Sequence, residues 1–98
     1  MEGIEWKSQE VATTLKLLSH PKRLLILCSL IDGEKTVWQL EWICMISQSQ
    51  LSQFLKKLKN EGMVQSKKEG LHVFYTISDI RIHWLLSYIE DHFCKNAC

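Results

Sequence analysis

The chain has 98 residues, of which 46% are hydrophobic and 23% are charged, and its formal net charge is +1. This composition is typical of a single small globular domain, and no apolar run is long enough to cross a bilayer. The N-terminal residues MEGIEWKSQE are polar and acidic and contain no secretory signal, so we expect a cytoplasmic protein without a membrane partner.

The first third of the sequence predicts two helices. Apolar residues keep to one face from about Ile4 to Leu18, and Ser19-His20-Pro21 then interrupts the pattern. Proline suits the first position of a helix, so a second helix is predicted from Pro21 to Gly33. Its run LLILCSLI is apolar nearly all round, which predicts the most buried helix of the domain.

The middle of the chain predicts two more helices joined by a short turn. Thr36 is followed three residues later by Gln39, and Ser47 by Gln50, which is the spacing of a capping box. In the second of these helices an apolar stripe is formed by Leu51, Leu55 and Leu58, and Gly62 provides the C-terminal stop. Two helices in this arrangement predict a helix-turn-helix.

The polar face of the helix after Ser47 is suited to contacting nucleic acid. It carries hydroxyls, amides and a lysine, with no carboxylate until Glu61. Such groups donate hydrogen bonds to phosphates and base edges with little repulsion from DNA. We therefore predict DNA contacts from Gln48, Ser49, Ser52, Gln53 and Lys56.

After Gly62 the period becomes that of strands. The segments MVQSK and HVFYTI predict a hairpin around a Lys-Lys-Glu-Gly tip, with Lys67 and Lys68 placed to meet phosphates. A last helix is predicted from Ser78-Asp79 to near Cys94. The fold is therefore predicted to be mainly α with a small β-hairpin wing, in the order helix, helix, helix, helix, strand, strand, helix.

This order predicts one winged helix-turn-helix DNA-binding domain over residues 1–98. The first and last helices lie outside the DNA-reading unit and are apolar on one face, so we expect them to form a homodimer that binds two-fold-related operator DNA. We expect the tryptophans to lie in the core or the dimer interface and Cys44 to be a packing residue; the tryptophans are Trp6, Trp38, Trp42 and Trp84.

The sequence resembles the ArsR/SmtB family of small bacterial repressors from about Val11 to Cys94. The resemblance is carried by LSHPKRLLIL, by ISQSQLSQFLKKLKNEGMV and by the wing KKEGLHVFYTI. It implies a homodimeric repressor that releases operator DNA when an inducer binds, and it implies the same DNA-contacting residues as above. The sequence departs from the family at Phe54, where histidine is frequent, so Phe54 is not predicted to contact DNA.

The cysteines bear on the inducer. Cys44 in LEWICMIS lacks the second thiol of the family's arsenic and cadmium motif, because the partnering position is Trp42. The placement of Cys28 and Cys94 resembles the branch that includes BigR, SqrR and HlyU. That resemblance implies that reactive sulfur species or oxidants bridge the two thiols and lower the affinity for DNA.

Other functions are kept as alternatives. A metal-responsive repressor is one, with weak candidate ligands at Cys94, Cys98, His83 and His92. A regulator without an inducer and a protein-interaction module that has lost DNA binding are others. No catalytic set or phosphate-binding glycine loop is visible, so we predict neither an enzyme nor a cofactor.

Overall fold

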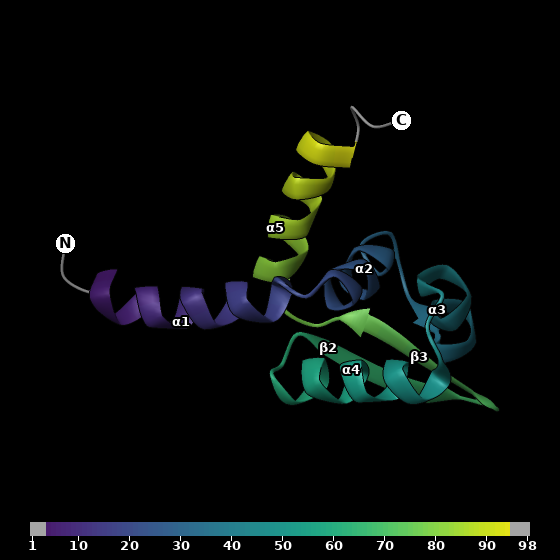
Figure 1. Cartoon of the computed structure of the whole chain (residues 1–98). Coiled ribbons are helices and arrows are strands. Elements are labelled where there is room, and N and C mark those ends of the chain that lie inside the picture. Colours follow the sequence, from purple (N-terminus) through teal and green to yellow (C-terminus); the bar gives the residue numbers. More distant parts are fainter. Residues whose placement is uncertain (1–3, 95–98) are drawn as a thin grey trace.

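The computed structural model describes residues 4–94 of the chain, with the side chains of residues 7–93. Five α-helices, three strands and a terminal π-helix follow one another along it (Figure 1). They are α1 (Ile4–Leu18), α2 (Pro21–Ser29), β1 (Lys35–Thr36), α3 (Val37–Cys44), α4 (Gln48–Asn60), β2 (Val64–Glu69), β3 (His72–Ile77), α5 (Ile80–Ile89) and η1 (Glu90–Cys94). The predicted order is confirmed for the five α-helices and the β2–β3 hairpin, whereas β1 was not predicted.

The arrangement places α3, α4 and the β2–β3 hairpin together at one side of the molecule. In Figure 1, α4 lies along the hairpin. Helix α1 extends to the left, away from the tip of the hairpin, and α5 rises away from the sheet. The hydrophobic core joins α2, α3, α4 and α5, and its fully buried side chains include Ile26, Leu27, Leu40, Leu51, Leu55, Leu58 and Leu86. The three leucines predicted to form the inner stripe of α4 are therefore core residues.

The second helix is shorter than predicted. It begins at Pro21 as expected but ends at Ser29, and the next four residues form turns down to Gly33. In these turns the Leu30 amide donates to the Leu27 carbonyl at 3.0 Å, and the Gly33 amide donates to the Leu30 carbonyl at 3.3 Å. Leu30 is still only 3% exposed. An apolar run predicts burial correctly here, although it does not require that the helix continue.

The helix caps of α3 and α4 differ in detail. Thr36 and Gln39 form the full capping box predicted for α3. At α4 the Ser47 hydroxyl accepts from the Gln50 amide at 3.2 Å, and among the described hydrogen bonds no return bond from the Gln50 side chain completes a box. Gly62 takes φ 75° just beyond α4, in the left-handed region that favours glycine.

The wing is a longer hairpin than predicted. Lys67 and Lys68 lie inside β2 and pair with Phe74 and Val73, so the turn consists of Gly70 and Leu71 and not of the Lys-Lys-Glu-Gly segment. The prediction ended β2 too early because a run of charged residues is typical of a turn. In the structure, the pairing between β2 and β3 continues through these charged residues. The sequence analysis also missed β1, whose two residues pair with β3 and complete a sheet of order β1-β3-β2. Two residues are too few to show a strand period.

Candidate nucleic-acid interface

The outer face of α4 is polar and exposed. The five residues predicted to contact DNA all lie exposed on it: Gln48, Ser49, Ser52, Gln53 and Lys56. The carboxylate of Glu61 lies just beyond the C-terminal end of α4, where Lys57 Nζ approaches Glu61 Oε1 at 3.9 Å. The middle of the face therefore offers hydrogen-bond donors and positive charge without a competing acidic group.

The start of α2 holds the turn that precedes α4. Lys22 Nζ donates to the Cys44 carbonyl at 3.0 Å, at the end of α3, and the next residue, Met45, adopts a left-handed φ of 53°. The His20 ring lies against Phe54 of α4 with ring centroids 4.9 Å apart. Phe54 is half-buried beside the core, so the residue that departs from the family pattern packs inward and orients α4.

The wing presents its two lysines on different faces. Side chains alternate along β2, and Val64, Ser66 and Lys68 share the face on which Val64 is buried. Lys59 Nζ of α4 donates to Ser66 Oγ at 2.7 Å, so this face is the one directed toward α4. Lys67 lies on the opposite face, where Lys67 Nζ is 2.7 Å from Glu69 Oε1.

The ion pair with Glu69 changes the electrostatics of Lys67. The hydrogen bond to Glu69 raises the pKa of Lys67, followed by the charge of the same carboxylate. Lys67 therefore stays protonated, but its ion pair with Glu69 has no net charge. Lys68 is the wing lysine whose charge is directed toward the same side as α4. The sequence analysis predicted the same role for both lysines. The faces on which they lie can be assigned only once the extent and pairing of β2 are known.

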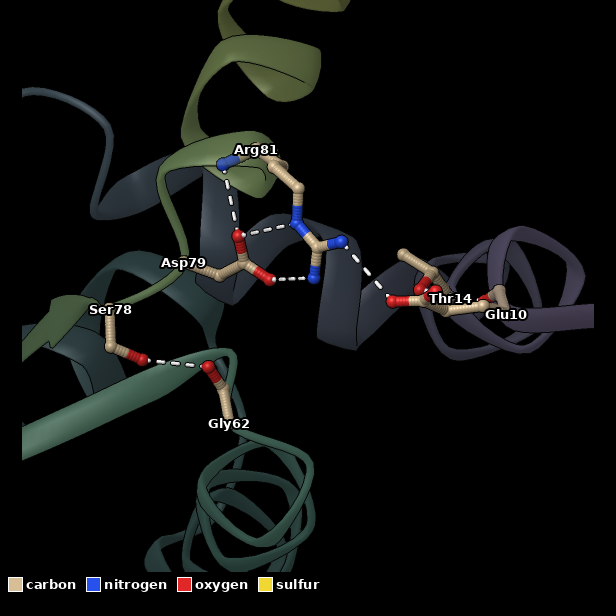
Figure 2. A network of polar contacts seen from close by, with 6 residues as sticks. All are labelled: Glu10, Thr14, Gly62, Ser78, Asp79 and Arg81. Atoms are coloured by element: carbon tan, nitrogen blue, oxygen red, sulfur yellow. Dashed lines mark hydrogen bonds and ion pairs between the residues drawn. The ribbon is translucent and has the colours of Figure 1, made fainter. Parts of the chain in front are cut away.

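A polar network connects the end of α4 to α5 and α1 (Figure 2). Ser78 Oγ donates to the Gly62 carbonyl at 2.8 Å, and the Ser78 amide donates to the Met63 carbonyl at 2.9 Å. Asp79 caps α5 by accepting from the Arg81 amide at 3.0 Å. The Arg81 guanidinium binds Asp79 through two nitrogens and reaches Glu10 of α1 at 3.2 Å.

These contacts link three helices at the protein surface. The hydrogen bond from Arg81 is the largest cause of the lowered pKa of Asp79, so the cap is ionised at neutral pH. Because Ser78 and Asp79 are adjacent, the start of α5 is joined by a hydrogen bond to Gly62, two residues beyond the end of α4. The sequence identified Ser78-Asp79 as a helix start, but nothing in it indicated the partners Gly62 and Glu10.

The cysteine predicted in the core helix lines a small cavity. Cys28 is half-buried at the edge of a cavity of about 240 Å³, whose other walls include Lys35 of β1 and Glu90 of η1. Glu90 is the residue at which α5 changes to a π-helix, and Cys94 is the last residue of that π-helix. The backbone of Cys94 therefore lies one turn beyond a residue that lines the Cys28 cavity, whereas the Cys94 side chain lies outside the described residues.

Cys44 differs from Cys28. It is 1% exposed and belongs to the core, as predicted for a packing residue. Burial is the largest cause of its raised pKa, which keeps the thiol protonated and unreactive at neutral pH. Of these two thiols, Cys28 is therefore the more accessible to solvent.

The weaker metal candidates are dispersed. His83 Nε2 lies 3.0 Å from the Ile31 carbonyl, and His92 Nδ1 lies 2.9 Å from the Tyr88 carbonyl. Among the described residues, no three His, Cys, Asp or Glu side chains gather in a group that could hold a metal ion. Cys98 lies outside the described residues, as does the side chain of Cys94.

Large apolar side chains are exposed on α1, α3 and α5. Trp38, Trp42 and Trp84 are 72%, 80% and 71% exposed, so they do not lie in the core of the single chain, and the alternative position in a dimer interface stays a prediction. Trp6 lies outside the described side chains. The exposed apolar residues of α1 and α5 are Val11, Leu15, Ile80, Trp84 and Tyr88. Such a set marks an interaction surface.

Comparison with known proteins identifies the family. Residues 20–66, which span the helix-turn-helix and the start of the wing, match the model of the family described as bacterial regulatory protein, arsR family. The biofilm growth-associated repressor of Xylella fastidiosa is 37% identical over 93 residues, covering 95% of this chain and 82% of that protein. This chain belongs to the ArsR family.

Solved structures of family members agree with the fold. Reduced HlyU from Vibrio cholerae superposes with a TM-score of 0.90 at 34% identity, covering 96% of this chain and 99% of that one. The transcriptional repressor BigR from Xylella fastidiosa superposes with a TM-score of 0.87 at 36% identity, covering 95% of each chain. The winged helix-turn-helix fold and the resemblance to the branch that includes BigR and HlyU are confirmed.

Family membership makes the chain a transcription regulator. The family relatives are regulators and not enzymes. Within residues 4–94, no helix is both long and apolar enough to span a membrane.

Several residues that shape the site were not found from the sequence. Lys22 and His20 hold the turn before α4, Lys59 joins α4 to the wing, and Lys35 and Glu90 line the Cys28 cavity. Each of these residues lies beside residues of another helix or strand, so no spacing within one element could have indicated it. A search for charged residues near element ends would have included Lys22, but it would not have supplied the Cys44 carbonyl as its partner.

Proposed function

We propose that the protein is a homodimeric repressor that binds double-stranded operator DNA through α4 and the wing. The observation that carries the proposal is the exposed polar face of α4, whose opposite face is fixed in the core by Leu51, Leu55 and Leu58. A rigid helix with donors on one side and a cationic strand beside it suits the major groove and its flanking phosphates. The contacting residues are Gln48, Ser49, Ser52, Gln53, Lys56 and Lys68, with a smaller contribution from Lys67.

The dimer would use α1 and α5. Val11 and Leu15 on α1, with Trp84 and Tyr88 on α5, are each at least half exposed in the single chain. Burying this exposed apolar surface against a second copy of the chain would stabilise a dimer. The two-fold symmetry of the dimer would then present two recognition helices to a palindromic site. The whole chain would then act as one DNA-binding domain with terminal dimerisation helices.

The inducer in this proposal is a reactive sulfur species or an oxidant that bridges Cys28 and Cys94. Support comes from the Cys28 cavity, which is lined by Glu90, one helical turn before Cys94. A bridge would tie the C-terminal end of α5 to α2. Because the start of α5 is bonded through Ser78 to the end of α4, a change in α5 alters the position of the recognition helix. A coupling of about 1–3 kcal/mol, which is usual between linked sites, is enough for release from DNA.

DNA binding is tested with variants of the exposed face of α4. Duplexes are first selected from a random-sequence library by the reduced protein, and affinities are then measured by fluorescence anisotropy. Ser52→Ala and Gln53→Ala together should weaken binding at least tenfold, since one lost base contact costs roughly 1–3 kcal/mol. Gln65→Ala, on the wing face directed away from α4, is the matched control. Unchanged affinity of the α4 variant would favour a protein-interaction module.

The sulfur switch is tested by the chemistry of the thiols. The reduced protein is treated with polysulfide or with peroxide, and peptide masses then establish the connectivity of the cysteines. A bridge between Cys28 and Cys94 is expected in the wild type and in Cys98→Ser, and not in Cys28→Ser. Modification confined to Cys98 would contradict the proposal, and stoichiometric metal on the reduced dimer would point to the metal-responsive alternative.

A further inference from the structure

A hollow with an excess of positive charge lies beside the C-terminal end of α4. Its volume is about 350 Å³, and its lining residues are Thr13, Lys16, Leu17, Arg23, Lys57 and Glu61. They come from the end of α1, from α2 and from the end of α4, and in Figure 1 the end of α1 lies above this end of α4. We call this the basic hollow, because three cationic side chains line it against one carboxylate.

The cations of the basic hollow are suited to an anion. Arg23 Nε donates to the Leu17 carbonyl at 2.8 Å, and this bond orients the guanidinium. Among the described side chains, no ion pair involves Lys16 or Arg23, whereas Lys57 Nζ lies 3.9 Å from Glu61 Oε1. Two cations therefore stay without an acidic partner even when Lys57 is counted as paired. A guanidinium anchored through Nε can still bind a phosphate through its terminal nitrogens.

The lysines of α4 relate the basic hollow to the exposed polar face of the helix. Successive residues of an α-helix are rotated by roughly 100°, so Lys57 and Lys59 point to nearly opposite flanks, with the exposed Lys56 between them. Lys59 is bonded to Ser66 of the wing. Lys57 and the basic hollow therefore lie on the flank of α4 that is opposite to the wing.

A helix in the major groove has a phosphate strand on each side. The groove is about 12 Å wide, and a helix with its side chains is about 10–12 Å across. The wing offers Lys68 to the strand on one side of α4. The strand on the other side would meet the flank that carries the basic hollow, so cations are present on both flanks of the recognition helix.

Building on the proposed DNA binding, we propose that the basic hollow is a second phosphate-binding site for operator DNA. Arg23 binds one phosphate through its terminal nitrogens, and Lys16 and Lys57 add positive charge around it. Glu61 opposes the same phosphate and limits the affinity of the site. The wing and the basic hollow together hold α4 between two phosphate strands, which sets its position in the groove.

The first test measures affinity for the selected duplex by fluorescence anisotropy at constant salt. Lys16→Gln and Lys57→Gln should each weaken binding by roughly fivefold for each half-site, the factor expected for unit charges about 4 Å apart in water. Glu61→Gln should strengthen binding, a gain that a misfolded variant cannot produce. Lys35→Gln and Asp32→Asn are matched controls, because they make the same changes of charge at an ion pair that does not line the basic hollow.

The second test locates the contact on the DNA. Duplexes are prepared with one uncharged methylphosphonate at each position of each strand, and the loss of affinity is measured for every position. Wild-type protein should lose affinity on both strands that border the major groove of a half-site. With Lys16→Gln the loss should shrink at one pair of two-fold-related phosphates, and with Lys68→Gln it should shrink at a different pair on the facing strand.

The outcomes separate this inference from the proposed function. If the three variants of the basic hollow bind like wild type while the Ser52→Ala, Gln53→Ala variant is weakened, the inference is overturned and DNA binding through α4 stands. The inference also falls if inorganic phosphate, followed by phosphorus NMR, binds the wild type and not Lys16→Gln although both have the same affinity for the duplex, because the site would then serve a free anion. Wild-type protein that binds no duplex would overturn both.

Discussion

The two wing lysines provide a sharp prediction, because the structure separates residues that are adjacent in the sequence. Lys68 shares the β2 face of Ser66, which is bonded to Lys59 of α4, whereas Lys67 is paired with Glu69 on the other face. Replacing Lys68 by glutamine should therefore remove a phosphate contact. Replacing Lys67 and Glu69 together by glutamine removes a pair with no net charge, and this double variant is the matched control.

The size of the effect follows from counterion release. Each phosphate contact contributes about 0.9 to the slope of log affinity against log salt on duplex DNA, so two copies of Lys68→Gln in a dimer should reduce the slope by roughly 1.8. The Lys67→Gln, Glu69→Gln double variant should change the slope much less than Lys68→Gln does, because it removes a pair without net charge. Both effects are measured by anisotropy titrations between about 50 and 200 mM salt, the range in which such slopes are resolved.

Two results would refute this reasoning. One is a Lys68→Gln variant that keeps the wild-type slope. The other is a double variant whose slope falls as far as that of Lys68→Gln. Either result would mean that the face of β2 directed toward α4 is not the face that approaches the phosphates.

Three further predictions concern stability and assembly. Ser47→Ala removes the acceptor for the Gln50 amide and should lower the free energy of unfolding in urea by about 1 kcal/mol, the usual cost of a lost N-cap; no change would show that α4 does not depend on this cap. Because its pKa is lowered in the fold, Asp79 stabilises the protein above its unfolded pKa of about 4 and loses this effect as pH falls through the lower folded value. The gap in unfolding free energy between wild type and Asp79→Asn should thus be widest at neutral pH and close in acid, and a constant gap would contradict the assignment. Trp84→Glu places a charge on the exposed face of α5 and should shift the protein to monomer in analytical ultracentrifugation, with loss of DNA binding, while a stable dimer would exclude this face from the interface.

The sequence predicted those parts of the fold that depend on local patterns. The leucine stripe of α4, the Thr36–Gln39 capping box, Pro21 at the start of α2 and the hairpin were all found this way. These features are set by residues three or four positions apart, or by the strand period. The predicted end of α2 was wrong, because an apolar run indicates burial and does not set the length of a helix. The predicted length of β2 was wrong, because strand pairing extends through charged residues that are locally typical of a turn.

The site was predictable only in part for the same reason. The exposed polar residues of α4 follow from its helical period, since the face opposite the leucines must meet solvent. The roles of Lys22, Arg81 and Glu90 depend on partners between 22 and 71 residues away or on the wall of a cavity. Contacts of this range become visible only when the helices are packed together.

The geometry suggests how the two ends of α5 are used. Its start is held by Asp79 and Arg81, and the adjacent Ser78 is bonded to Gly62 just beyond α4 (Figure 2). Its other end continues into η1, which begins at Glu90 on the wall of the Cys28 cavity and ends at Cys94. The two ends of α5 lie far apart in Figure 1. The helix changes to π-helical geometry at that end, and π-helical turns occur frequently at functional sites. In the proposed mechanism, α5 is the element whose position differs between the reduced and the bridged protein.

The most direct test of the central claim is the affinity of the reduced and the bridged protein for the same selected duplex, measured at one salt concentration with Cys28→Ser treated in parallel. We predict that bridging Cys28 to Cys94 weakens binding at least tenfold, whereas treated Cys28→Ser keeps the affinity of the reduced protein. Equal affinities of the reduced and the fully bridged wild type would contradict the account.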